Sequence, residues 1–338
     1  MGRLDSLILI VSNAQDVTAD FFERKLTAAG KPFTRLNTEC LADVPLTLTF
    51  GTGPAPRRWA NVRGSLLNLD HIKGIYYRRP VQPHVPGNAT TATKAWVANE
   101  LRRAWGGFLA ARSDIRWVNH PLAVSAASYK PEQLARAERY GLKIPETVIT
   151  SVPEEALAFC ERHAYDVVVK PVGHGEIREA TPDQDRIVYT NAITRACRPL
   201  LERVSGCPTL LQRRIAKAVD LRITVVDDEC IAVAMHSQDR AVSAIDCRRA
   251  NMQGMRYSLT QLPSTIERTL VTLVRSYGLL YAAIDMARDT DGEHWFFEVN
   301  PAGQWAWLEE KVGAPVSQAL IHCFGRHGGV GDVLPRSP

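Results

Sequence analysis

Short apolar runs alternate with amphipathic stretches through the first third of the chain. Strands that alternate with helices favour a parallel or mixed sheet that is covered on both faces, so we expect an α/β unit over residues 1–121. Glycine and proline residues mark loops at 52–58 and 80–88. The pattern predicts strands at 7–12, 33–36, 46–50, 74–77 and 115–118, and helices at 17–29 and 91–111.

The rest of the chain predicts two further units, over residues 122–206 and 207–330, and a Gly- and Pro-rich tail at 331–338 that we expect to be mobile. In the first, Pro153 stands where a helix begins and where its missing N–H costs no hydrogen bond. This unit has helices at 131–140 and 154–163 and strands at 147–150 and 165–169. The second has strands at 210–212, 221–226 and 230–235, a helix at 265–277, two apolar strands that end near residues 286 and 300, and a helix at 316–324.

Oxygen ligands lie close to the ends of those two apolar strands. Asp285 belongs to the first strand, and Glu298 and Asn300 belong to the second. The period of two along a strand places Glu298 and Asn300 on one face. Magnesium prefers hard oxygen ligands and is usually held by one or two carboxylates together with phosphates of the substrate, so the three residues are a candidate magnesium site. The alternative is an ordinary hairpin whose strands have acidic ends.

Two lysines precede these strands. Lys170 ends an apolar run and is followed by a loop that contains Gly173 and Gly175, which is typical of a phosphate contact covered by backbone N–H groups. Lys130 stands directly before the helix at 131–140. Each lysine taken singly is also compatible with an ordinary solvated side chain.

The order of these features along the chain resembles the ATP-grasp superfamily over about residues 120–325. It runs from Lys130 to the strand lysine with its glycines, then to a hinge, an Asp-x-Arg strand, an Asp strand and a Glu-x-Asn strand. The resemblance implies an α/β fold in which a pre-ATP-grasp domain (1–121) precedes a small central lobe (122–206) and a large C-terminal lobe (207–330). It also implies ATP and Mg²⁺ as cofactors.

The same resemblance implies a role for each candidate residue. Lys130 and Lys170 would contact the α- and β-phosphates, and Gly173 and Gly175 would cover them. Arg222 would neutralise the γ-phosphate and then an acyl phosphate. The remaining contacts that it implies are Gln212 and Ile215 around the adenine, and Asp285, Glu298 and Asn300 around Mg²⁺.

Three longer motifs narrow the resemblance to the graspetide (microviridin-type) maturases of ribosomal peptides. They are IYYRRP at 75–80, DLRITVV at 220–226 and EVNPAGQWAWL at 298–308. Members of this class use ATP to couple side-chain carboxylates of a precursor peptide to its own hydroxyls or amines. The resemblance therefore implies a ribosomal precursor peptide, a leader plus an acidic core, as partner, and it leaves ester or amide linkage and a homodimer open.

Arg78 and Arg79 in the first of these motifs would either clamp the acidic core or merely flank a strand. The chain departs from the pattern at Asp246-Cys247-Arg248, where an aromatic residue is expected between the acid and the arginine. The roles of Asp246 and Arg248 therefore stay undetermined at this level.

Composition and charge fit this interpretation. The net charge is +5 and the isoelectric point is about 8.8, but the arginine pairs are isolated and no aromatic RNA-binding motif is present, so nucleic acid is not expected as a partner. The excess of positive charge suits the negatively charged partners ATP and an acidic peptide. The first apolar run is too short for a membrane span, and no membrane contact is expected. Seven cysteines without metal-binding spacing favour reduced thiols in the cytoplasm and argue against a zinc site.

Three functions remain open. One is a peptide cyclase, which the length of the third motif favours. The second is a free-standing ligase that adds an amino acid to a peptide or small molecule. The third is a nucleotide-binding module that has lost catalysis.

Overall fold

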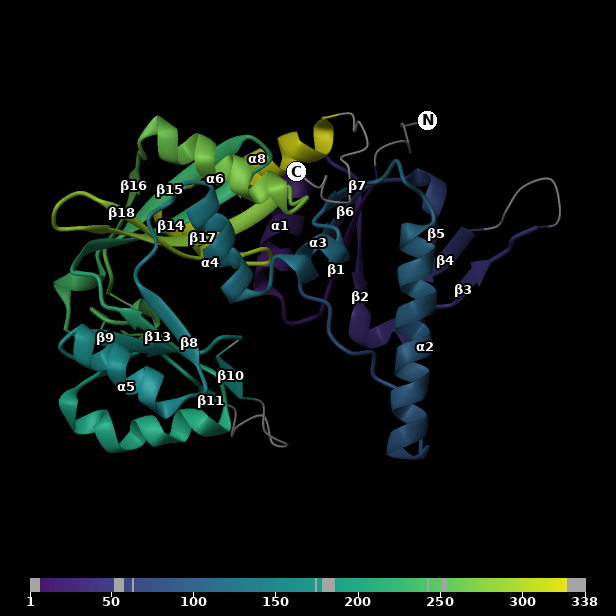
Figure 1. The fold of residues 1–338 in the computed structure, drawn as a ribbon. Helices are drawn as coiled ribbons and strands as arrows, with labels where there is room; N and C mark the ends of the chain where they lie inside the picture. The colour runs from purple at the N-terminus through teal and green to yellow at the C-terminus, as the bar shows by residue number, and fades with distance from the viewer. Residues whose placement is uncertain are drawn as a thin grey trace.

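The computed structural model describes most of the chain and confirms an α/β fold built from several sheets (Figure 1). The predicted tail at 331–338 lies outside the described residues. Within the described residues, no helix is long and apolar enough to cross a membrane. The structure describes residues 7–51, 58–62, 64–173, 175–177, 186–241, 243–250 and 254–326.

The N-terminal unit is built on a parallel sheet, as the alternation of strands and helices predicted. The strand order is β2-β1-β6-β7, and every neighbouring pair is parallel. The first helix begins after Asp16, whose carboxylate accepts a hydrogen bond from the Thr18 N–H. The elements are β1 (Leu7–Ser12), α1 (Val17–Ala28), β2 (Phe33–Asn37), β6 (Ile72–Tyr77), α2 (Thr91–Ala110) and β7 (Arg116–Val118).

A small antiparallel sheet beyond α2 was not predicted in full. It consists of β3 (Leu46–Leu48), β4 (Arg58–Val62) and β5 (Ser65–Asn68), of which the sequence indicated only the first. The other two strands are short, and their alternating pattern rests on a few apolar residues such as Ala60 and Val62, which are buried. The predicted loop at 52–58 lies outside the described residues except for Arg58, which begins β4.

The small lobe has an antiparallel sheet in the order β12-β9-β13-β8. Strand β13 lies between β9 and β8, so this sheet continues beyond residue 206, where the small lobe was predicted to end. The long 3-10 helix η4 was not predicted, and Pro199 lies inside it. The elements are β8 (Thr147–Thr150), α5 (Pro153–Arg162), β9 (Val167–Lys170), β10 (Glu176–Ile177), β11 (Arg186–Ile187), β12 (Asn191–Ile193), η4 (Arg195–Gly206) and β13 (Thr209–Arg213).

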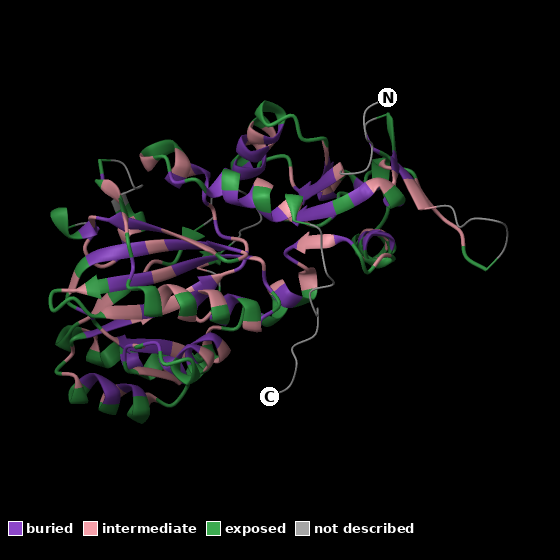
Figure 2. Cartoon of the chain, turned by 90° about the horizontal axis from the view of Figure 1, so that it is seen from above, coloured by how far each residue is buried: buried purple, intermediate pink, exposed green. Residues whose placement is uncertain are grey.

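The large lobe is built on an antiparallel sheet in the order β16-β15-β14-β17-β18, in which the inner strands β15, β14 and β17 are mostly buried (Figure 2 colours buried residues purple). The sequence did not predict β16 or α7. The strands are β14 (Lys217–Val226), β15 (Glu229–Met235), β16 (Tyr257–Thr260), β17 (Tyr281–Asp289) and β18 (His294–Asn300). The helices are α3 (Pro121–Ala126), α4 (Lys130–Arg139), α6 (Ser264–Ser276), α7 (Ala306–Val312) and α8 (Val316–Gly325).

Helix α4 was predicted to belong to the small lobe (122–206), but it packs on the large-lobe sheet. Leu134 and Ala137 belong to the same buried cluster as Ile284 and Phe296 of that sheet. Gln133 fixes the helix to β18, because its amide donates to the Val299 carbonyl (2.8 Å) and accepts from the Val299 N–H (2.9 Å). The first residue of α4, Lys130, is thereby held beside the end of β18.

A second buried cluster joins the N-terminal unit to the large lobe. Trp305 is fully buried, and its indole Nε1 donates a hydrogen bond to the Tyr76 hydroxyl (2.7 Å). Its ring meets Phe21 and Phe22 edge to face, with centroid distances of 5.6 and 6.0 Å. Such contacts add to the free energy of apolar burial, so the Trp305 motif is part of the interface between the two units.

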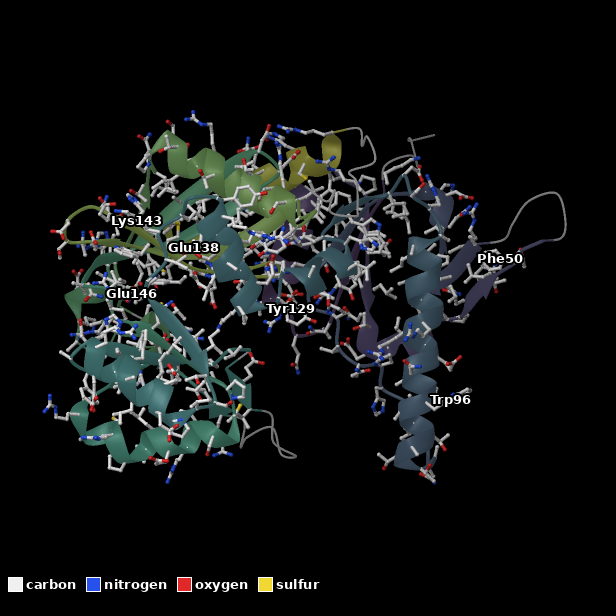
Figure 3. The ribbon with its side chains drawn as sticks, viewed as in Figure 1. Phe50, Trp96, Tyr129, Glu138, Lys143 and Glu146 are labelled. Atoms are coloured by element: carbon white, nitrogen blue, oxygen red, sulfur yellow. The ribbon has the colours of Figure 1, made fainter. Side chains whose placement is uncertain are left out.

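Replacement of Trp305 by alanine should lower the free energy of unfolding by about 3–5 kcal/mol, because it opens a large cavity between the two units. The matched control is Trp96→Ala on α2, where the side chain is exposed (Figure 3) and the expected change is within about 0.5 kcal/mol. Denaturant titration measures both values. Equal stability of the two variants would contradict the structural role of Trp305.

Candidate active site

The three predicted magnesium ligands lie together on neighbouring strands. Asp285 of β17 stands directly opposite Glu298 of β18, and Asn300 lies two residues further along the same strand. The side chains of Asp285 and Glu298 are 32% and 34% exposed, so both carboxylates can be reached. The interpretation of β17 and β18 as an ordinary hairpin also describes their connection, but it does not account for the cations described below.

The pairing of β17 with β18 contains a bulge at Phe297 that the sequence did not reveal. Asp285 pairs with Glu298, but Met286 pairs with Phe296, so Phe297 is the extra residue. Bulges commonly stand next to active sites because they redirect side chains. The Phe297 ring lies 4.3 Å from the Lys170 ammonium nitrogen, which brings the end of β9 in the small lobe next to β18.

Each carboxylate has a cation of its own. Arg222 Nη1 lies 2.8 Å from Asp285 Oδ1, and Lys130 Nζ lies 3.1 Å from Glu298 Oε2. Burial raises the pKa of Asp285, and the charge of Glu298 adds to this effect while Arg222 opposes it. Burial also acts to raise the pKa of Glu298, but the charges of Lys130, Lys170 and Arg222 together hold this pKa below its usual value.

Lys170 lies at the end of β9, where the sequence placed it. Its ammonium donates to Gln212 Oε1 (2.8 Å), and the Gln212 amide donates to the Thr147 hydroxyl (2.9 Å). Burial lowers the pKa of Lys170 to about 8, against the attraction of Glu298. Gln212 therefore holds the lysine, in addition to its predicted place beside the adenine.

The glycine loop contacts Lys130 and the segment of the same chain at Val188. Lys130 Nζ donates to the Pro171 carbonyl (2.8 Å) and lies 3.5 Å from the Gly173 carbonyl. The Gly175 carbonyl accepts a hydrogen bond from the Val188 N–H (2.6 Å), and a Cβ at Gly175 would lie 2.6 Å from the Val188 oxygen. This close approach gives a backbone reason for glycine at 175, and the phosphate contact of the loop stays a prediction.

The other predicted site residues are Ile215, Arg78 and Arg79, and they differ in how far they are buried. Ile215 is buried between β13 and β14, and its contact with the adenine stays a prediction. Arg78 is buried, with its guanidinium bonded to Asp16 and to the chain at 302–304. Arg79 is exposed at the end of β6. The contact of both arginines with a substrate stays a prediction.

Asp246 and Arg248 form an ion pair, and Asp246 also accepts a hydrogen bond from the small lobe. The buried Asp246 carboxylate accepts from the Thr190 N–H (2.9 Å) and from Arg248 Nη2 (2.6 Å). Burial acts to raise the pKa of Asp246, but the hydrogen bonds from Arg248 and Thr190 lower it to about 2. The pair therefore joins the large lobe to the strand region next to β12.

The sequence did not single out Lys217 and Asp220 as site residues. Lys217 Nζ lies 2.9 Å from both carboxylate oxygens of Asp220, and its charge acts on Lys170. A spacing of three residues normally places two strand side chains on opposite faces. A register shift between Lys217 and Val219 changes this, and the sequence carries no clear signal for it.

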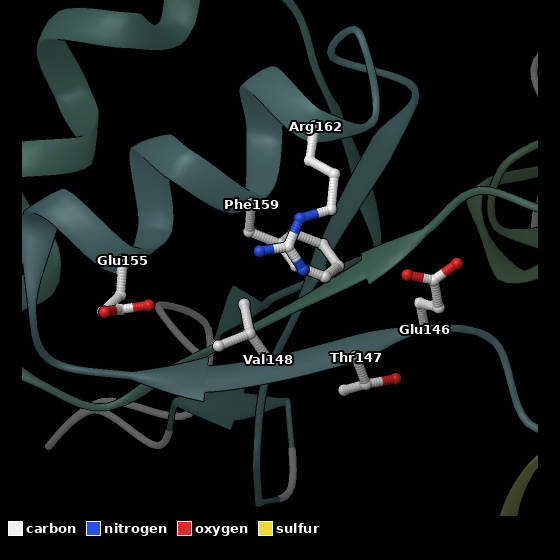
Figure 4. A pocket seen from close by; sticks show the side chains of 6 residues that line it. All are labelled: Glu146, Thr147, Val148, Glu155, Phe159 and Arg162. Carbon is white, nitrogen blue, oxygen red and sulfur yellow. The ribbon is translucent and has the colours of Figure 1, made fainter.

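A surface hollow of about 260 Å³ lies elsewhere, at the edge of the small lobe (Figure 4). Its lining includes Glu146 beside β8, and Glu155 and Arg162 of α5. Thr147 of β8 also lines the hollow, and its hydroxyl accepts a hydrogen bond from Gln212 of the centre described above. The mixed charge of the hollow gives it no evident part in phosphate binding.

The donor set at β17 and β18 fits Mg²⁺. The described residues contain no group of three or more His, Cys, Asp or Glu side chains suited to a metal, so a cation here relies on two carboxylates, the Asn300 amide and phosphate oxygens. Magnesium is commonly held in this way. The two facing carboxylates would also be stabilised by a divalent cation, because burial makes their negative charge costly.

Comparisons with known proteins agree with this geometry. The chain is 26% identical to a RiPP-associated ATP-grasp ligase of Chryseobacterium gregarium, solved with ADP and with a leader and core peptide, at a TM-score of 0.85 over 97% of this chain and 98% of that one. It is 27% identical to macrocyclase MdnC of Microcystis aeruginosa MRC, solved with precursor peptide MdnA, at a TM-score of 0.80 over 94% and 99% of the two chains. A tetrahydromethanopterin:α-L-glutamate ligase of Methanocaldococcus jannaschii is 24% identical over 210 residues, which are 60% of this chain and 68% of that protein. No protein-family model matches the chain.

Glu298→Gln should reduce kcat by about 100-fold or more, because it removes a preorganised charge but keeps the size of the side chain. The matched control is Glu293→Gln on the same hairpin, where the carboxylate pairs with the exposed Lys143 (Figure 3) and turnover should stay unchanged. Release of ADP in the presence of substrate measures both. Near-normal turnover of Glu298→Gln would remove this residue from the metal site.

ATP affinity should fall as the pH rises through about 8, because the Lys170 ammonium then loses the proton that attracts phosphate. Bound phosphate favours the charged lysine, so complex formation should take up protons, and Kd should rise by up to about tenfold per pH unit above this pKa. Calorimetry in buffers of different ionisation enthalpy measures both effects. Lys170→Met should bind ATP more weakly and without this pH dependence, whereas a wild-type affinity that stays constant from about pH 7 to about pH 9 would contradict the assignment.

Proposed function

The chain is an ATP-grasp ligase, and we propose that it closes side-chain ester or amide cross-links within a ribosomally made precursor peptide. ATP and Mg²⁺ are its cofactors. The ADP, leader and core peptides bound by the Chryseobacterium ligase, and the precursor bound by MdnC, support the proposed substrate class.

The observation that carries the proposal is the meeting of cations from both lobes at two facing carboxylates. The small lobe contributes Lys170, and the large lobe contributes Lys130 and Arg222. Triphosphate bears several negative charges, so cations and a metal site in one place suit it better than they suit a neutral ligand.

We propose that ATP activates a carboxylate of the precursor. The carboxylate oxygen attacks the γ-phosphorus, the bond between this phosphorus and the bridging oxygen breaks, and ADP leaves. A hydroxyl or amine of the same peptide then attacks the acyl carbon, loses its proton, and displaces inorganic phosphate. Each cycle forms one ester or amide bond and consumes one ATP.

The residues mainly position groups and neutralise charge, which is what phosphoryl transfer requires. In this proposal Lys130 and Lys170 would contact the phosphates nearer the adenosine. Arg222 would neutralise the transferred phosphoryl group and then the acyl phosphate. Mg²⁺ would be held by Asp285, Glu298 and Asn300, where it would neutralise phosphate charge.

Arg79 is the better candidate of the two adjacent arginines for contact with an acidic core. It is exposed at the carboxyl end of β6, and its backbone carbonyl accepts a hydrogen bond from Asn13 (2.6 Å), which fixes the strand end beneath it. The buried Arg78 would need to give up contacts within the chain before it could bind a substrate carboxylate.

A second candidate function is the addition of a free amino acid. The similarity to a tetrahydromethanopterin:α-L-glutamate ligase favours it, because that name gives a free amino acid as one of the joined partners. The two functions use the same activation step and differ in the source of the amine. The mass of the product therefore separates them.

We place the reaction in the cytoplasm. All seven cysteines are free thiols in the structure. Free thiols suit a reducing compartment, and ATP is supplied there.

A candidate precursor encoded beside this gene, incubated with the enzyme and Mg-ATP, should lose the mass of one water for each ADP and phosphate released. Mass spectrometry and a coupled ADP assay measure the two quantities. A mass increase by one amino acid residue would support the second candidate and overturn the first. ATP binding without turnover of any peptide would indicate a module that has lost catalysis.

Arg79→Ala should raise the KM for an acidic precursor by about tenfold, because a charge-assisted contact to carboxylate is lost, and should leave ATP affinity unchanged. The matched control is Arg103→Ala, an exposed arginine on α2 of the same unit. Steady-state kinetics with the precursor and ATP varied in turn separate the two effects. Equal KM values for the two variants would exclude Arg79 from substrate binding.

A further inference from the structure

The turn that follows β18, residues 301–305, is held from outside its own lobe. Arg78 at the end of β6 donates through Nη1 to the carbonyls of Ala302 (3.2 Å) and Gly303 (2.8 Å). Its Nη2 donates to Gln304 Oε1 (3.1 Å), which also accepts from the Thr18 hydroxyl. One guanidinium of the N-terminal unit therefore contacts three successive residues of the turn.

Two further side chains hold the turn, Asn119 from the N-terminal unit and Tyr281 from the large lobe itself. Asn119, directly after β7, donates to the carbonyls of Pro301 (2.8 Å) and Tyr281 (2.7 Å), so it ties the start of the turn to the start of β17. The Tyr281 hydroxyl donates to the Gly303 carbonyl (2.7 Å). All three side chains are buried, so solvent does not compete for these hydrogen bonds.

The opposite side of the turn faces the active site. Arg222 Nη2 donates to the Gln304 carbonyl (3.2 Å), and the Ala302 N–H donates to Asn300 Oδ1 (3.1 Å). The fit at Gly303 is close, because a Cβ there would lie 2.7 Å from Arg222 Nη2 and 2.4 Å from the Ala283 Cβ. A shift of the turn would therefore move Arg222, proposed for the transferred phosphoryl group, and Asn300, a proposed magnesium ligand, together.

Arg78 is itself fixed from the N-terminal unit. Asp16 Oδ2 lies 3.4 Å from Arg78 Nε and accepts from the Ser12 hydroxyl (2.6 Å). Removal of one partner of a buried ion pair is costly, so the position of the guanidinium is well defined.

The contact between Arg78 and the 301–305 turn lies at the carboxyl ends of strands in the parallel sheet. In open α/β sheets, ligands bind at the carboxyl ends of the strands where the strand order reverses. Here the reversal lies between β1 and β6, and the Gln304 side chain reaches Thr18 and Arg78 at that place. The N-terminal unit thus uses the ligand-binding edge of its sheet to hold a turn of the catalytic lobe.

We propose that Arg78, Asn119 and Tyr281 are positioning residues for phosphoryl transfer, which act through the 301–305 turn on Arg222 and Asn300. The proposal rests on the proposed function in that it takes these two residues as contacts of Mg-nucleotide. In this proposal Arg78 positions Arg222 and Asn300 and does not contact the precursor.

The test uses the full chain and a fluorescent, non-hydrolysable ATP analogue, titrated with Mg²⁺ and with EDTA. Tyr281→Phe removes only the hydroxyl and its hydrogen bond, and the gain in affinity that Mg²⁺ provides should fall by about three- to tenfold. Affinity in EDTA should stay within about twofold of wild type, because Lys130 and Lys170, the lysines proposed to contact phosphate, are unchanged. The matched control is Tyr277→Phe, whose hydroxyl bonds Glu132 on α4 and whose titrations should equal those of wild type.

Arg78→Lys keeps the charge but loses the fork that reaches three residues, so it should show the same selective loss of the Mg²⁺ effect. Its matched control is Arg116→Lys, which alters another ion pair between the N-terminal unit and the large lobe, with Asp227 (2.8 Å). If Arg78→Lys does not fold, Tyr281→Phe alone decides. With a precursor, kcat should fall in both test variants while the KM for the precursor stays constant.

Wild-type response to Mg²⁺ in Tyr281→Phe would overturn the proposal, as would an equal loss of affinity with Mg²⁺ and with EDTA. A raised KM for the precursor at constant kcat in Arg78→Lys would indicate instead that Arg78 contacts the precursor. A wild-type chain whose nucleotide affinity does not respond to Mg²⁺ would overturn both proposals. A chain that responds to Mg²⁺ but releases no dehydrated peptide would overturn the proposed function alone.

Discussion

The arrangement of the lobes depends on the electrostatic cost of two carboxylates that face each other across β17 and β18. Partly buried like charges on directly paired residues are stable only with counter-charges close by. Arg222 and Lys130 supply these charges in the structure, and each arrives from a different element. The same constraint makes the place suitable for a divalent cation and a triphosphate, which bring their own complementary charges.

Lys130 joins the two lobes at this centre. Its helix packs on the large-lobe sheet, but its ammonium donates to the Pro171 carbonyl of the small lobe. Lys170 approaches from the small lobe and contacts Phe297 of the large lobe. A phosphate group between the lobes would therefore meet side chains that already touch both of them, so that little reorganisation is needed on binding.

The sequence predicted those features whose signal is local. The strands at 7–12 and 147–150 and the set of Asp285, Glu298 and Asn300 follow from apolar runs and the period of two. The bulges at Phe297 and near Lys217 were missed because a register shift depends on the partner strand and leaves no mark in one sequence. The packing of α4 on the large sheet was also missed, because it is a contact between segments far apart in the chain.

The motif around Trp305 has a consequence for how relatives of this chain are recognised. Trp305 and Gln304 bind Tyr76, Thr18 and Arg78, so selection for a stable fold would preserve them whether or not the protein turns over substrate. A shared motif of this kind reports common ancestry and architecture. Active and inactive descendants would instead be told apart by the acidic and amide side chains just before it, at 298 and 300.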